Sequence, residues 1–134
     1  MNEAKKLIGC NRRSIEVAGM LLTDVCYGVA DACGWWRDPS TGERIERNKG
    51  ELIALMHSEL SECLEGVRKD CADDKLPHRK MEEVELADAV IRIFDYAGGF
   101  GLNLGEAIIE KLAFNVDRHD HQPAARAAAG GKKF

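Results

Sequence analysis

The pattern of hydrophobic and polar positions along the chain predicts helices and no strand. Apolar residues recur every three or four positions, as on one face of an α-helix, and the alternation typical of a half-buried strand is missing. Ile15, Ala18 and Leu22 begin one such stripe. We therefore expect an all-α protein with helices over about residues 12–33, 49–70, 81–97 and 104–118.

Local signals place the ends of these helices. Asn48 and Asn103 are suitable N-caps, each followed three positions later by a glutamate, Glu51 and Glu106, as in a capping box. Gly34 is a suitable stop for the first helix. The turn-rich stretch after it predicts a loop over residues 34–48.

The composition is that of one folded domain. The 134 residues are 45% hydrophobic and 31% charged, which suits a core and a solvated surface. No apolar run approaches the roughly 20 residues of a membrane span, and the N-terminal segment lacks the apolar stretch of a signal peptide. Five cysteines, an odd number, argue against a secreted disulfide scaffold. We expect a soluble cytoplasmic protein without a membrane partner.

Negative charge is concentrated in the middle of the chain. Residues 51–100 carry 6 Lys/Arg and 12 Asp/Glu, a net charge of −6, within a total of −4. A nucleic-acid surface requires clustered positive charge, so we expect no nucleic-acid partner. The acidic middle indicates either a solvated face or a cation site.

The positions of four carboxylates favour the cation site. On the second helix Glu59 falls inside the apolar arc and Glu62 lies on its edge, although a carboxylate among apolar neighbours is costly unless it is paired or bound to metal. On the third helix Glu85 and Asp88 fall on the polar half, where they would face solvent if that helix stood alone. If the two helices form an antiparallel hairpin, all four carboxylates can meet. Oxygen ligands of this kind suit Mg²⁺ or Mn²⁺, and the Glu-x-x-His motif of a di-iron site is missing.

Further candidates lie on either side of these helices. One face of the fourth helix carries Lys111, Asn115 and Arg118. This face is either a binding site for a polyphosphate or an ordinary solvated surface. Trp35 and Trp36 either anchor the loop on the core or stack on a planar ligand such as a nucleobase.

The acidic motifs resemble those of the MazG-like all-α nucleoside triphosphate pyrophosphohydrolases. Glu59-x-x-Glu62 and Glu85-x-x-Asp88, separated by 22 residues, match the family pattern of ExxE, a spacer and ExxD, and Lys111, Asn115 and Arg118 match its downstream positions. The resemblance covers about residues 34–134 and is closest to short phage-type members. That part of the likeness is carried by Gly34-Trp35-Trp36, Leu76-Pro77-His78-Arg79, Glu85-Leu86-Ala87-Asp88-Ala89 and Gly130-Gly131-Lys132-Lys133. One departure is Ser58, where many members have a further Glu.

The resemblance implies a fold: a helical bundle with a two-helix carboxylate hairpin, completed by oligomerisation into a homodimer or homotetramer. We expect an all-α domain of this kind over residues 1–121, followed by a tail over residues 122–134 that Gly130 and Gly131 make flexible. For a phage-encoded member, the location would be the host cytoplasm.

The resemblance also implies hydrolysis of a (deoxy)nucleoside triphosphate to the monophosphate and pyrophosphate, with water attacking the α-phosphorus. A purine substrate is favoured, dGTP before dATP. Two or more Mg²⁺ or Mn²⁺ ions per site would be held by the four carboxylates, and Glu59 or Glu62 would accept the proton of the water. Lys111 and Arg118 would offset the charge of pyrophosphate, and either tryptophan would contact the base. From the tail, Lys132 and Lys133 would reach phosphates.

Two other interpretations stay open. The chain can be a non-catalytic helical module whose acidic face binds a partner protein, which predicts no metal dependence. It can also be a related pyrophosphohydrolase acting on dUTP or phosphoribosyl-ATP, with the same metals and a different base pocket.

Overall fold

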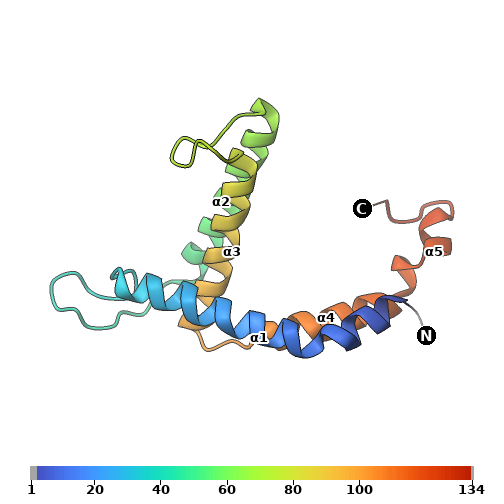
Figure 1. Cartoon of the computed structure of the whole chain (residues 1–134), viewed down its shortest axis with the longest axis horizontal. Coiled ribbons are helices and arrows are strands. Elements are labelled where there is room, and N and C mark those ends of the chain that lie inside the picture. Colours follow the sequence, from blue (N-terminus) through green and yellow to red (C-terminus); the bar gives the residue numbers. More distant parts are fainter. Residues whose placement is uncertain (1–2, 134) are drawn as a thin grey trace. The chain divides into compact units, whose positions relative to one another are not determined.

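The prediction of an all-α protein is confirmed by the computed structural model, which describes residues 3–133 (Figure 1). Within these residues extended pairing is limited to isolated bridges, Arg37 with Arg44 and Ala72 with Lys80. The helices are α1 Glu3–Ala32, α2 Lys49–Lys69, α3 Met81–Gly99, α4 Leu104–Asp117 and α5 Pro123–Ala127, with a 3₁₀ turn at His119–His121. None of these described helices is both long and apolar enough to span a membrane.

The described residues form two compact units. One unit consists of residues 22–102, and the other of the first part of α1 together with everything from Asn103 onwards. The predicted domain over residues 1–121 and tail over residues 122–134 stay predictions, and their ends, residues 1–2 and 134, lie outside the described part of the chain.

Helix α1 begins well before the predicted start at residue 12. No proline interrupts Glu3–Ala32, and the residues before Gly9 are mostly good helix formers. Gly9 and Asn11, just before the predicted start, have low helix propensity, but the helix continues through them. Within the helix the Asn11 side chain donates to the carbonyl oxygen of Leu7 at 2.8 Å. The end of α1 was predicted well, because Gly34 has φ +86° and its N–H bonds back to Asp31.

The other predicted helix ends agree with the structure to within a few residues. Asn48 accepts a hydrogen bond from the Glu51 N–H, and Asn103 accepts one from the Glu106 N–H, so both predicted N-caps are confirmed. Helix α3 continues to Gly99, past the predicted residue 97. A helix not predicted as a separate element, α5, lies within the predicted tail.

Helices α2 and α3 pack side by side and run antiparallel (Figure 1). Near one end, Gly66 faces Met81 and Glu82, and an added Cβ at Gly66 would lie 3.0 Å from the Glu82 nitrogen. Further along, Glu59 of α2 meets Arg92 of α3. The sequence positions therefore run in opposite directions along the two helices. Through this packing Glu59 of α2 reaches Arg92 on the polar half of α3.

The core of residues 22–102 is centred on Trp36, whose ring is 1% exposed. Its indole N–H donates to Asp95 Oδ1 at 2.7 Å, and its ring meets Tyr27 and Phe100 edge to face. The ring lies directly against Gly99. Trp36 thereby holds the loop after α1 against the end of α3.

In the other unit, the N-terminal part of α1 crosses α4 at a pair of glycines. The Cα of Gly105 lies where a side chain at Gly19 would begin, so the two backbones touch. Lys5 and Asp117 form an ion pair at 2.6 Å in the same unit. After α4, the Gln122 side chain donates to the carbonyl oxygen of Val116 at 2.8 Å and fixes the turn before α5.

Candidate metal centre

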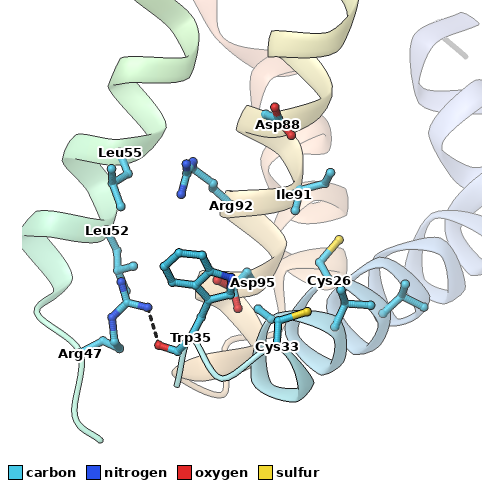
Figure 2. A pocket seen from close by; sticks show the side chains of 13 residues that line it. Cys26, Cys33, Trp35, Arg47, Leu52, Leu55, Asp88, Ile91, Arg92 and Asp95 are labelled. Atoms are coloured by element: carbon cyan, nitrogen blue, oxygen red, sulfur yellow. Dashed lines mark hydrogen bonds between the residues drawn. The ribbon is translucent and has the colours of Figure 1, made fainter. Parts of the chain in front are cut away.

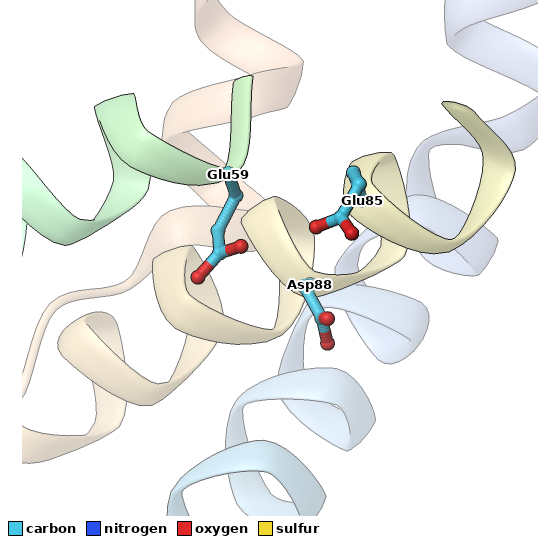
Figure 3. Close-up of side chains that lie close together, drawn as sticks. All are labelled: Glu59, Glu85 and Asp88. Carbon is cyan, nitrogen blue, oxygen red and sulfur yellow. The ribbon is translucent and has the colours of Figure 1, made fainter. Parts of the chain in front are cut away.

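Three of the four predicted carboxylates come together between α2 and α3. One oxygen each from Glu59, Glu85 and Asp88 lies within 4.8 Å of the others (Figure 3). Glu59 is 7% exposed and Glu85 is 6% exposed, and Asp88 is half-buried. We call these three residues the acidic triad. Buried acidic groups at this separation repel one another strongly unless protons or cations neutralise them.

The fourth predicted ligand, Glu62, lies outside the triad on an exposed position of α2. Its charge nevertheless contributes to the electrostatics of Glu85. The position of Glu59 agrees with its place in the apolar arc of the sequence. Glu85 is more buried than its position on α3 alone indicates, because α2 covers this part of the polar half and buries the carboxyl.

Glu85 is the member of the triad in an electrostatic environment that strongly disfavours its charged form. Its pKa is raised to about 7, first by burial and then by neighbouring carboxylates, Glu62 foremost. No ion pair to Glu85 occurs among residues 3–133. A buried carboxyl group that lacks a positive partner and faces two other carboxylates is suited to binding a divalent cation.

Glu59, in contrast, has a positive partner that the sequence analysis did not identify. The Arg92 Nε donates to Glu59 Oε1 at 2.5 Å. Arg92 lies four positions after Asp88 on α3 and therefore on the same side of that helix. That spacing was the available signal, but the sequence alone did not show that α2 would bring Glu59 within reach.

A cavity of about 430 Å³ adjoins the triad and shares Asp88 with it (Figure 2). Its wall is mostly apolar, with charged groups from Arg47, Arg92 and Asp95. Arg47 donates to the carbonyl oxygen of Trp35 at 2.8 Å. Burial raises the pKa of Asp95, an effect opposed by the hydrogen bond from Trp36. An apolar hollow with a few charged groups suits a ligand that has both an apolar and a charged part.

The two adjacent tryptophans have different environments. The Trp36 ring is buried in the core against Tyr27 and Phe100, which fits the alternative that it anchors the loop on the core. Trp35 is 67% exposed and lines the cavity. Only Trp35 of the pair offers a ring to a ligand.

The predicted phosphate-binding stripe lies in the unit that contains α4. Lys111 and Asn115 are on that helix, with the Lys111 ammonium 4.7 Å from the centre of the Phe114 ring. The buried Asn115 Oδ1 has no hydrogen-bond partner among the described residues. Arg118 is the C-cap residue that follows the last helical residue, and it pairs with Asp120 at 2.6 Å.

No protein-family profile matches the chain, and comparison with curated proteins and with solved structures likewise finds no match.

Proposed function

We propose that this protein is a divalent-cation-dependent nucleoside triphosphate pyrophosphohydrolase. Its substrate is a (deoxy)nucleoside triphosphate, with a purine deoxynucleotide favoured and dGTP placed before dATP, as the resemblance to MazG-like enzymes implies. The products are the monophosphate and pyrophosphate. The observation that carries the proposal is the acidic triad, in which Glu85 is buried and has no positive partner among residues 3–133.

The donor set of the triad supports Mg²⁺ or Mn²⁺ as the cofactor. All three groups offer carboxylate oxygens, the ligands that these hard cations prefer. The resemblance to MazG-like enzymes implies two or more ions per site. Ions bound there would neutralise phosphate charge and lower the pKa of a water molecule.

Within this proposal the residues of the α2–α3 carboxylate hairpin have distinct roles. Glu59, Glu85 and Asp88 hold the cations. Glu62 accepts the proton of the attacking water, since it is exposed beside Glu85, whereas Glu59 is engaged by Arg92. Glu59 stays the second candidate for this role.

The cavity is the proposed location of the nucleoside part of the substrate. It shares Asp88 with the triad, so a ligand there would have its phosphates next to the carboxylates. The exposed ring of Trp35 provides a surface for stacking on a base. Lys111, Asn115 and Arg118, together with Lys132 and Lys133, stay proposed phosphate contacts on the strength of the resemblance.

The activity is tested by incubating the purified protein with dGTP, dATP, dUTP and phosphoribosyl-ATP in Mg²⁺, in Mn²⁺ and in EDTA. We expect pyrophosphate from a purine deoxynucleotide in either metal and none in EDTA, because the metal site is required for the reaction. Preferred cleavage of dUTP or phosphoribosyl-ATP would favour the related enzymes. Orthophosphate without pyrophosphate would place the cleavage at another bond, and no hydrolysis of any compound would favour the non-catalytic module.

We further propose that a second copy of this chain covers the outer faces of α2 and α3 and forms a homodimer or homotetramer. Seven large apolar side chains of these helices that do not line the cavity are between 39% and 53% exposed, and they recur at helical spacing. They are Ile53, Leu60, Leu64 and Val67 on α2 and Leu86, Val90 and Ile93 on α3. Such stripes are typical of helices that pack against a partner.

Sedimentation equilibrium tests this association. We expect a mass two or four times the 14.8 kDa of one chain, and we expect Leu64→Glu to reduce the mass towards the monomer by placing a charge in the interface. Leu7→Glu is the control, because Leu7 is 66% exposed on α1 outside these faces. A wild-type protein that sediments as a monomer at micromolar concentration would contradict the proposal.

A further inference from the structure

Arg92 is the positive group that contacts the acidic triad within residues 3–133. Its side chain extends from α3 toward α2, as Figure 2 shows, and its Nε reaches Glu59 Oε1. The Glu59 side chain is 9% exposed and that of Arg92 is 39% exposed. Glu59 therefore lies deep in the interface, while the guanidinium reaches it from the more open side.

This ion pair gives Glu59 the counter-charge that its burial requires. A buried carboxylate is costly unless a positive group neutralises it. A divalent cation held by Glu59, Glu85 and Asp88 would provide the same neutralisation with twice the charge. The guanidinium and the cation repel each other, and both use the oxygens of Glu59. The Arg92–Glu59 pair therefore opposes metal binding at the triad.

Arg92 also lines the cavity, together with Asp88 and Asp95. A guanidinium released from Glu59 therefore stays beside the space where we place the nucleotide. Guanidinium groups bind phosphate oxygens through two parallel hydrogen bonds. The same side chain can thus neutralise Glu59 in the metal-free protein and a phosphate in the loaded one.

We infer that Arg92 is an internal counter-ion which a divalent metal displaces from Glu59 and which then binds the phosphates of the substrate. This inference rests on the proposed function, because it requires a metal at the acidic triad. It makes Arg92 a residue whose partner changes between the empty and the loaded protein.

The first test is calorimetric titration with Mn²⁺ alone, without nucleotide, at one pH. We expect Arg92→Gln to bind Mn²⁺ about tenfold more tightly than the wild type, since a positive charge next to the site is removed. Arg92→Lys keeps the charge and should stay close to the wild type. Arg79→Gln is the matched control, because it removes an arginine from an exposed pair with Glu83 and should leave Mn²⁺ affinity unchanged. A merely structural Arg92 would give weaker or equal binding after its replacement.

The second test uses hydrolysis at saturating metal. There Arg92→Gln should raise KM for the nucleotide about tenfold, because the phosphate contact is lost. If Arg92→Gln does not fold, the wild-type protein can be tested by NMR. Adding Mg²⁺ should shift the signal of the Arg92 Nε–H. That signal is assigned by its absence from the spectrum of Arg92→Lys. An unshifted signal, or Mn²⁺ affinity that does not increase in Arg92→Gln, overturns this inference alone. If the wild type does not bind Mn²⁺, or if Glu85→Gln binds it as tightly as the wild type does, the proposed function is overturned as well.

Discussion

Replacing Glu85 with glutamine is expected to lower metal-dependent pyrophosphate release at least about 100-fold while making the metal-free protein more stable. Glutamine has nearly the same shape, but it is a much poorer ligand for Mg²⁺. In the metal-free protein above about pH 7, Glu85 is ionised while buried beside other carboxylates. Removing that charge should raise the free energy of unfolding by about 1–3 kcal/mol. Steady-state kinetics and urea unfolding in EDTA measure the two effects.

The pH dependence of stability provides a check on the same carboxyl group. Its pKa is about 7 in the folded protein, against an ordinary value of 4.5. Between these values the folded state keeps a proton that the unfolded state has lost. The contribution of Glu85 to the free energy of unfolding therefore falls as pH rises from about 4.5 to about 7. Glu85→Gln should lack this part of the slope, so its advantage over the wild type should be larger at about pH 8 than at about pH 5.

Glu83→Gln is the matched control for this prediction. Glu83 lies on the same helix, is exposed and pairs with Arg79. Its replacement should change neither turnover nor the pH dependence of stability, because exposed pairs contribute little. Wild-type turnover in Glu85→Gln would contradict the assignment of Glu85 as a metal ligand. Equal stability of both proteins at all pH values would contradict its burial as a charged group.

The sequence predicted those features that depend on one helix at a time. The N-caps at Asn48 and Asn103 depend on a side chain and a backbone N–H three positions away, so a local pattern was sufficient. The unusual position of Glu59 was also visible, because a carboxylate interrupts an apolar arc on a single helix. For the same reason the start of α1 was wrong: weak helix formers at Gly9 and Asn11 interrupt the local pattern, although the helix continues through them.

Features that depend on two elements could not be predicted in the same way. Glu85 lies on the polar half of its own helix, and it becomes buried because α2 packs over that position. Arg92 looks like an ordinary surface cation until α2 places Glu59 within reach. The different environments of Trp35 and Trp36 arise because a loop presents one ring to α3 and leaves the other outside. To predict each of these features, one must know how the neighbouring elements are aligned against each other.

Replacing Gly99 with alanine is expected to destabilise the protein by about 3 kcal/mol, even though alanine is the better helix former. The new methyl group would overlap Cη2 and Cζ2 of Trp36. That ring is fully buried between Tyr27 and Phe100, so it has no free space to move into. If it is displaced, its hydrogen bond to Asp95 is lost as well. Thermal and urea unfolding measure the loss, and quenching of the buried indole's fluorescence should accompany it.

Gly28→Ala separates this effect from helix propensity. Gly28 lies in α1, and a Cβ there would meet nothing within 4 Å. This substitution should stabilise the protein by up to about 1 kcal/mol, opposite in sign to the effect at Gly99. Because Asp95 lines the cavity and bonds to Trp36, a displaced ring in Gly99→Ala should also weaken nucleotide binding while Mn²⁺ binding at the triad persists. If Gly99→Ala is as stable as the wild type, Trp36 does not hold the loop after α1 against α3.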